Sequence, residues 1–225
     1  MSKKEFLDEL IIEMIDEVEQ SAIPVSEQGM KSEEVKLEEQ TIYTGLKIKN
    51  KWIYFEERLF VEDKVTMMIP EDFEEMSLED AKKKYPSEER PKTILTDETT
   101  AINIMFNYMD QEIADEKIEK FRDQLINGMK WVNPGIKPRE SGSEIISDKT
   151  VAYVEFTNPV LGGKLYNLLY FMELEGHALM MTFNCMTKDM KYWKKAAFEM
   201  MKSIKILDQI NEEDKDGQEI EQTKD

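Results

Sequence analysis

Four strand-like segments follow one another between residues 143 and 186, and this run constrains the fold more than any other feature of the sequence. The segments cover residues 143–147, 151–157, 164–174 and 177–186, and the connections contain Asp148-Lys149, Gly162-Gly163 and Glu175-Gly176. Short connections of this kind join antiparallel strands, whereas parallel strands need a crossover of a dozen or more residues. The second half of the chain therefore predicts an antiparallel meander.

Helical periodicity occurs before and after this meander. Apolar residues three or four positions apart predict one helix over 115–132 and another over 189–203. Upstream, residues 101–109 alternate as a strand does, and shorter strands are expected at 65–69 and 93–95 with a short helix at 78–85. A long antiparallel meander with helices on either side of it in the sequence is typical of an α+β fold.

Charge divides the chain into parts. Of the net charge of −18, residues 1–40 carry −8 (12 acidic, 4 basic) and residues 208–225 carry −6 (8 acidic, 2 basic), which leaves −4 for residues 41–207. The apolar periodicity is concentrated between residues 41 and 207. We therefore predict an amphipathic helix within 1–24, an acidic linker at 25–40, a folded domain at 41–207 and a disordered acidic tail at 208–225.

The total charge also excludes classes of partner. A chain at −18 is repelled by phosphate backbones and by anionic lipid surfaces, so we expect no nucleic-acid and no membrane partner. No run of 18 apolar residues is present, and acidic residues interrupt the amino-terminal segment where a secretory signal would be apolar. The single cysteine, Cys185, fits a reducing compartment. The predicted location is the cytoplasm.

Residues 3–19 form the clearest amphipathic pattern, with acidic residues opposite the apolar stripe. An isolated helix this short is marginal in water, so the stripe is expected to bind a protein surface. Either the chain's own domain or another chain, including a second copy, would provide that surface. The predicted partner-binding residues are Phe6, Leu7, Leu10, Ile11, Met14, Ile15 and Val18.

The sequence contains no recognisable catalytic, metal-binding or cofactor-binding motif. His177 opens a strand beside a glycine turn, and Cys185 shares its strand phase with Leu179 and Phe183, so both are interpreted as structural residues. Residues 212–217 resemble half of an EF-hand loop, but Thr223 occupies the position that requires a glutamate. We expect no enzyme, no cofactor and no metal. An enzyme with a carboxylate site stays open as an alternative, because 48 acidic residues make some close pairs inevitable.

Methionine is abundant, with 16 residues, and six of them cluster near the last predicted hairpin and helix. Met-rich surfaces adapt to varied apolar partners, but methionine more often fills gaps in a core. Both interpretations apply to Met180, Met181, Met186, Met190, Met200 and Met201.

Several segments between residues 53 and 207 resemble the PsbP-like superfamily, which includes Mog-type, PsbP and DcrB-like proteins. The resemblance rests on an early strand ending in Pro70, the strand Ile102-Asn103-Ile104, the hairpin 166–185, and the closing helix Phe198-Glu199-Met200-Met201-Lys202-Ser203-Ile204. Residues 84–91 further resemble a bacterial branch. The resemblance implies an α/β/α sandwich around a mainly antiparallel sheet, to which this chain would add its amino-terminal helix.

Known members of this superfamily are adaptors, chaperones or assembly factors. The resemblance therefore implies a non-catalytic protein-binding module, an adaptor or a secretion-associated chaperone in the bacterial cytoplasm, binding through the sheet face or the Met-rich end. An immunity protein that neutralises a basic toxin would exploit the acidity directly and is a further alternative. A concave apolar groove would favour the binding module, and a closed pocket with convergent carboxylates would favour an enzyme.

Overall fold

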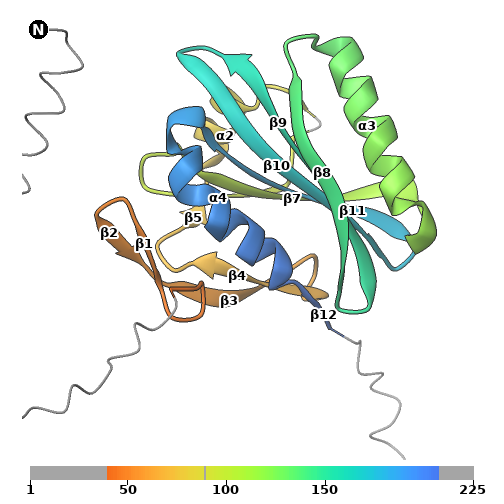
Figure 1. Cartoon of the computed structure of the whole chain (residues 1–225), viewed down its shortest axis with the longest axis horizontal. Coiled ribbons are helices and arrows are strands. Elements are labelled where there is room, and N and C mark those ends of the chain that lie inside the picture. The colour runs from red at the N-terminus through yellow and green to blue at the C-terminus, as the bar shows by residue number, and fades with distance from the viewer. Residues whose placement is uncertain (1–39, 89, 208–225) are drawn as a thin grey trace, which may run out of the picture. The chain divides into compact units, whose positions relative to one another are not determined.

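A computed structural model describes residues 40–88 and 90–207 (Figure 1). Its largest element is a seven-stranded sheet in the order β5-β6-β7-β11-β10-β9-β8. All of its pairings within the described residues are antiparallel. The strands are β5 (Glu74–Glu75), β6 (Thr93–Thr96), β7 (Asn103–Glu112), β8 (Lys137–Ile146), β9 (Lys149–Val160), β10 (Gly163–Leu174) and β11 (His177–Met186).

Two smaller sheets are built mainly from the first part of the domain. β1 (Leu46–Ile48) and β2 (Lys51–Ile53) form a hairpin. The other sheet has the order β12-β4-β3, with β3 (Phe55–Phe60), β4 (Val65–Pro70) and β12 (Lys205–Ile206). β12 is the last strand of the described residues, and it pairs with the early strand β4 through Lys205 and Thr66.

The helices are α2 (Leu78–Lys84), α3 (Ile118–Val132) and α4 (Thr187–Lys202), and the short 3-10 helix η1 (Asp115–Lys117) leads into α3. The Ser77 hydroxyl caps α2 by accepting a hydrogen bond from the Asp80 N–H at 3.1 Å. The start of α3 is fixed by Asp115, which accepts hydrogen bonds from the backbone N–H and the hydroxyl of Thr150.

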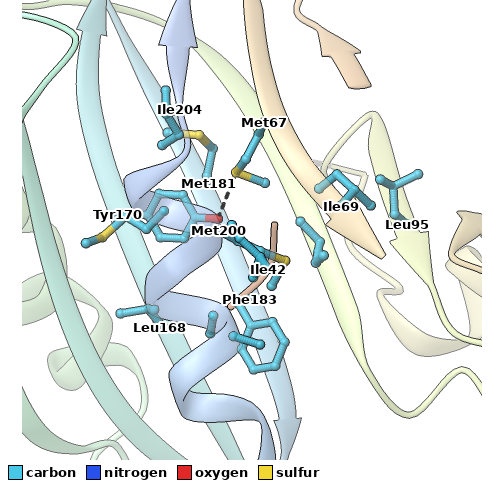
Figure 2. Close-up of a cluster of buried hydrophobic side chains, with 14 of the residues drawn as sticks. Ile42, Met67, Ile69, Leu95, Leu168, Tyr170, Met181, Phe183, Met200 and Ile204 are labelled. Atoms are coloured by element: carbon cyan, nitrogen blue, oxygen red, sulfur yellow. Dashed lines mark hydrogen bonds between the residues drawn. The ribbon is translucent and has the colours of Figure 1, made fainter. Parts of the chain in front are cut away.

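One face of the seven-stranded sheet packs on α4 and on the small sheets, and we call it the α4 face. Strand residues two positions apart, such as Leu168 and Tyr170 or Met181 and Phe183, point into this layer and are completely buried (Figure 2). The Tyr170 hydroxyl donates to the Met67 sulfur at 3.5 Å, which links β10 to β4 (Figure 2). The main apolar core therefore lies between the large sheet and α4.

The opposite face, here called the α3 face, packs on two separate helices. α3 covers β9 and β10 through an apolar cluster that includes Val154, Phe171 and Ile126. α2 covers the region near β6 and β7 through a smaller cluster that includes Met76 and Ile94. Met180 on β11, at the margin of the α3 cluster, and its neighbour Asn107 on β7 are only half-buried. The helices α2 and α3 thus leave part of the α3 face uncovered.

The expected α+β class and the mainly antiparallel sheet are confirmed. Most expected elements occur within a few residues of their predicted bounds, but β8 begins at Lys137 rather than at residue 143. Its first half is an exposed edge with a register shift between Pro138 and Ser141, so it has no buried side to produce alternation. The predicted helix within 1–24, nearly all of the 25–40 linker and the 208–225 tail lie outside the described residues.

Candidate functional site

An open apolar groove lies where the end of β7 and the β10–β11 turn meet the start of α3. It consists of two adjoining hollows of about 560 and 540 Å³ that share Glu112, Ile113 and Lys117. Ile113, Phe121 and Leu125 supply apolar surface, and all three are half-buried. We call this feature the α3 groove.

The walls of the α3 groove are held by specific contacts. The Ile113 N–H donates to the Gly176 carbonyl oxygen at 2.8 Å, which joins the end of β7 to the β10–β11 turn. On the helix side, the Phe121 ring packs edge-on against Phe171 with 5.9 Å between ring centroids. The groove is therefore a fixed part of the α3 face.

The helix rim of the groove is basic. Lys117 and Lys120 line it, and neither forms an ion pair with any residue that the structure describes. On the opposite rim, Glu175 is paired with Lys64 at 2.7 Å.

Farther along the helix, Gly128 has open space around the position of a Cβ atom. Positions 117, 121, 124 and 128 follow helical spacing, so the groove side of α3 continues toward Gly128.

A smaller hollow of about 230 Å³ lies beside the β1–β2 hairpin. Its apolar surface includes Phe73 and Trp193, and its walls carry the ion pairs Lys49–Asp189 (2.5 Å) and Lys51–Asp72 (2.6 Å). The Asp189 carboxylate, which is almost fully buried, raises the pKa of Lys49. Pockets for small-molecule ligands typically measure about 300–1,000 Å³. This hollow is smaller, and both of its lysines already have an aspartate partner.

The buried carboxylates do not form a shared acidic centre. Glu155 has no exposed surface, and it accepts hydrogen bonds from Lys194 and from the Tyr166 hydroxyl, both at 2.7 Å. Burial, together with the Glu155 carboxylate, raises the pKa of Tyr166. Glu173 is paired separately with Lys149. Because each carboxylate has its own lysine, the geometry is that of structural ion pairs.

A row of polar side chains crosses the α3 face beside α2. Thr96, Asn103, Asn184 and Asn167 stand directly opposite one another on four neighbouring strands. Asn103 donates to the Asn184 side-chain oxygen at 2.8 Å, and Asn184 donates to the Tyr85 hydroxyl at 3.3 Å. The alternation over residues 101–109 predicted the strand but not the row. The signal that could have revealed the polar row is the occurrence of asparagine at strand positions that are buried.

The structure supports the structural interpretation of the two singled-out residues. Cys185 is fully buried, and burial together with Asp189 raises the pKa of its thiol to about 12. A thiol in that state is a poor nucleophile. His177 is the first residue of β11, where its ring packs at 5.8 Å from the Tyr108 ring, and it also lies on the rim of the α3 groove.

The methionine cluster divides between core and surface. Met181, Met200 and Met201 have no exposed surface and belong to the α4-face core. Met180, Met186 and Met190 are half-buried. The interpretation of the whole cluster as one binding surface is wrong, because half of its members fill the core. Within the described residues, no group of three or more His, Cys, Asp or Glu side chains is arranged to hold a metal ion.

The predicted partner-binding stripe (Phe6, Leu7, Leu10, Ile11, Met14, Ile15 and Val18) lies outside the described residues, and so does the EF-hand-like segment 212–217. Among the helices that the structure describes, none is long and apolar enough to cross a membrane.

No protein-family model and no curated protein matches the sequence. Solved structures do match. LpqN of Mycobacterium tuberculosis, described as involved in cell envelope biogenesis, aligns over 75% of this chain and 98% of its own, with 12% identity and a TM-score of 0.46. A putative regulator of unknown function from Pseudomonas aeruginosa aligns over 70% and 99%, with 12% identity and a TM-score of 0.38.

Cyanobacterial PsbP from Synechocystis sp. PCC 6803 aligns over 68% of this chain and 92% of its own chain, with 9% identity and a TM-score of 0.52. At this identity the match concerns the fold and not the function. The residue-level resemblance found in the sequence predicted the same fold. The described domain of this chain therefore has a PsbP-like fold.

Proposed function

We propose that this protein is a non-catalytic protein-binding module, an adaptor or chaperone of the bacterial cytoplasm, which binds an amphipathic helix of its partner in the α3 groove. The observation that carries the proposal is the open groove itself, with apolar surface from Ile113, Phe121 and Leu125 on an otherwise well-packed sheet. Helix-in-groove binding places an apolar helix face into such a groove.

The form of the groove favours a macromolecular partner over a small substrate. Its two hollows are open and adjoin along the start of α3, whereas a small-molecule site encloses most of its ligand. Lys117 and Lys120, which have no ion-pair partner in residues 40–88 and 90–207, favour a partner helix with acidic residues beside its apolar stripe.

The amino-terminal stripe from Phe6 to Val18 is a second proposed contact, with a partner or with a second copy of the chain. Leu10→Glu together with Ile11→Glu places two charges in this stripe. Self-association or partner capture should then weaken in sedimentation or affinity experiments, while the melting temperature changes little.

Gly128 offers a matched pair of variants for testing the groove. Gly128→Trp places a large side chain on the groove side of α3, and Gly128→Ala adds one methyl group in open space at the same position. Affinity capture from the native host should recover a set of proteins with Gly128→Ala and lose it with Gly128→Trp. Both variants should melt cooperatively at similar temperatures.

Equal capture by both variants would show that the groove is not the binding surface. A second pair extends the test to charge. Lys117→Glu with Lys120→Glu should weaken capture about 25-fold or more, because each reversed rim charge affects an interface by roughly 1 kcal/mol or more. Lys82→Glu with Lys92→Glu alters two exposed lysines away from the groove and should leave capture unchanged.

A further inference from the structure

The other end of α3 and the β9–β10 turn carry the three most exposed large apolar side chains among the described residues. Trp131 is 86% exposed and Val132 is 77% exposed at the carboxyl end of the helix, and Leu161 is fully exposed in the β9–β10 turn. Single exposed apolar residues need no explanation, but three such side chains on two neighbouring segments do.

These residues lie at the same end of the molecule. α3 runs alongside β9, since its start is bonded to Thr150 and the turn after it reaches Pro159. A Cβ atom on Gly135 would stand 2.7 Å from the Pro159 ring, so this turn and the β9–β10 hairpin are in contact. Figure 1 shows the end of α3, the start of β8 and the β9–β10 turn along one edge of the domain. We call this surface the α3 tip.

The local charge at the α3 tip is positive, whereas the net charge of the protein is negative. Residues 124–139 and 156–172 contain Lys130, Lys137, Arg139 and Lys164 but no acidic residue. All four basic side chains are exposed, and none forms an ion pair within the part of the chain that the structure describes. The next acidic residue along β8, Glu140, is near Lys194 at 3.5 Å. A protein with a net charge of −18 thus has one end that is both basic and apolar.

We propose that the α3 tip docks on an anionic lipid surface, with Trp131, Val132 and Leu161 inserted at the headgroup level and the basic residues beside the phosphates. Tryptophan prefers this interfacial depth because one part of its ring system is apolar and its N–H is polar. Basic residues next to an anionic leaflet add attraction that acts within about one Debye length. The side chains project from a helix end and a hairpin turn, so they can enter the surface of a bilayer together.

The total charge predicts repulsion from such a surface, but most of that charge lies in residues 1–40 and 208–225. At contact distance, local charge decides, because salt screens charges that are farther away than about 8–10 Å. The tip is at the opposite end of α3 from the α3 groove, so this proposal does not depend on the groove. A chain that used both surfaces would attach a bound partner to the membrane.

The test uses the full chain and vesicles of phosphatidylglycerol and phosphatidylcholine, with pure phosphatidylcholine vesicles for comparison. Co-sedimentation should detect binding to the anionic vesicles, and it should weaken as salt rises. Trp131→Ser with Leu161→Ser should abolish measurable binding. Lys130→Glu with Lys164→Glu should reduce the partition coefficient about 25-fold or more, since each basic residue near the surface contributes about fivefold.

The control variants make the same kinds of substitution at positions outside the α3 tip. Trp52→Ser removes another exposed tryptophan, and Lys47→Glu reverses another lysine without an ion pair in the described region. Both should bind vesicles as the unmodified chain does, and all variants should keep its melting temperature. Absence of binding to anionic vesicles, or equal loss in the control variants, would overturn the proposal. Loss of partner capture without any vesicle binding would instead assign the tip to a protein partner and would also overturn it.

Discussion

The two faces of the seven-stranded sheet differ in what covers them. On the α4 face, one helix and the small sheets bury most of the strand side chains, and Leu168, Tyr170 and Phe183 have no exposed surface. On the α3 face, α2 and α3 leave a polar row and an open groove between and beside them. The α4 face contains the main apolar core, and the α3 face leaves the surface that the proposed partner would contact.

The largest expected effect compares one phenylalanine from each face. Phe183 is fully buried between the Tyr166 and Trp193 rings, so Phe183→Ala should destabilise the protein by about 3–5 kcal/mol. Phe121 is half-buried on the α3 groove, and Phe121→Ala should cost about half as much or less. Chemical denaturation would measure both. Equal losses would contradict the proposed difference between the faces.

The next effect concerns the polar row. Asn184→Ala removes the acceptor for the fully buried Asn103 side-chain amide, and an unsatisfied buried group costs about 1–3 kcal/mol. Asn107→Ala, on the same face but half-buried, should change the free energy of unfolding by less than about 0.5 kcal/mol. If both variants melt alike, the row does not contribute specifically to stability.

The third effect depends on pH. Burial opposes ionisation of Glu173, but Lys149 and the Gly176 N–H outweigh burial, so the pKa of Glu173 lies below its ordinary value. A carboxyl with a lowered folded-state pKa stabilises the fold above its unfolded pKa, and this stability is lost as the pH falls through the folded pKa. Lys149→Met should cost about 1 kcal/mol at neutral pH. The difference from the unmodified chain should shrink between about pH 5 and pH 3. A difference independent of pH would contradict this account.

The smallest effect is a gain. Gly128 lies in the interior of α3 with open space at its Cβ position, so Gly128→Ala should stabilise the protein by about 0.5–1 kcal/mol. Thermal melting of the full chain measures the shift. A loss of stability would mean that the space beside Gly128 is occupied.

Alternation and spacing predicted the strands that have one buried side. Ile102, Ile104 and Phe106, which share one phase of the predicted alternation over residues 101–109, are buried on the α4 face, and the short helix predicted at 78–85 occurs as α2. The first half of β8 was missed because its side chains are exposed, so no apolar pattern marks it.

The surfaces were harder to predict than the elements. Ile113, Phe121 and Leu125 come from a loop and from one helix, and local periodicity does not say that the β10–β11 turn will close a groove around them. The α3 tip likewise brings the turn after α3, at Gly135, against Pro159 of the β9–β10 hairpin, which follows it in the sequence by more than twenty residues. The negative net charge of the chain argued against a membrane-binding surface, because acidic residues elsewhere outnumber the basic residues of the α3 tip.

The pairing of β12 with β4 has a consequence for how the chain acquires its structure. Lys205 and Ile206 complete a sheet that begins near Val65, and α4, which precedes them, covers the main core. Contacts between segments so far apart in the sequence slow folding, because the chain between them must first be brought into a closed loop at a cost in entropy. During synthesis, the apolar side of the meander is open until α4 has left the ribosome. The domain is thus expected to finish folding only after nearly all of it has been synthesised. Until then its exposed strands are prone to aggregate and to bind general chaperones.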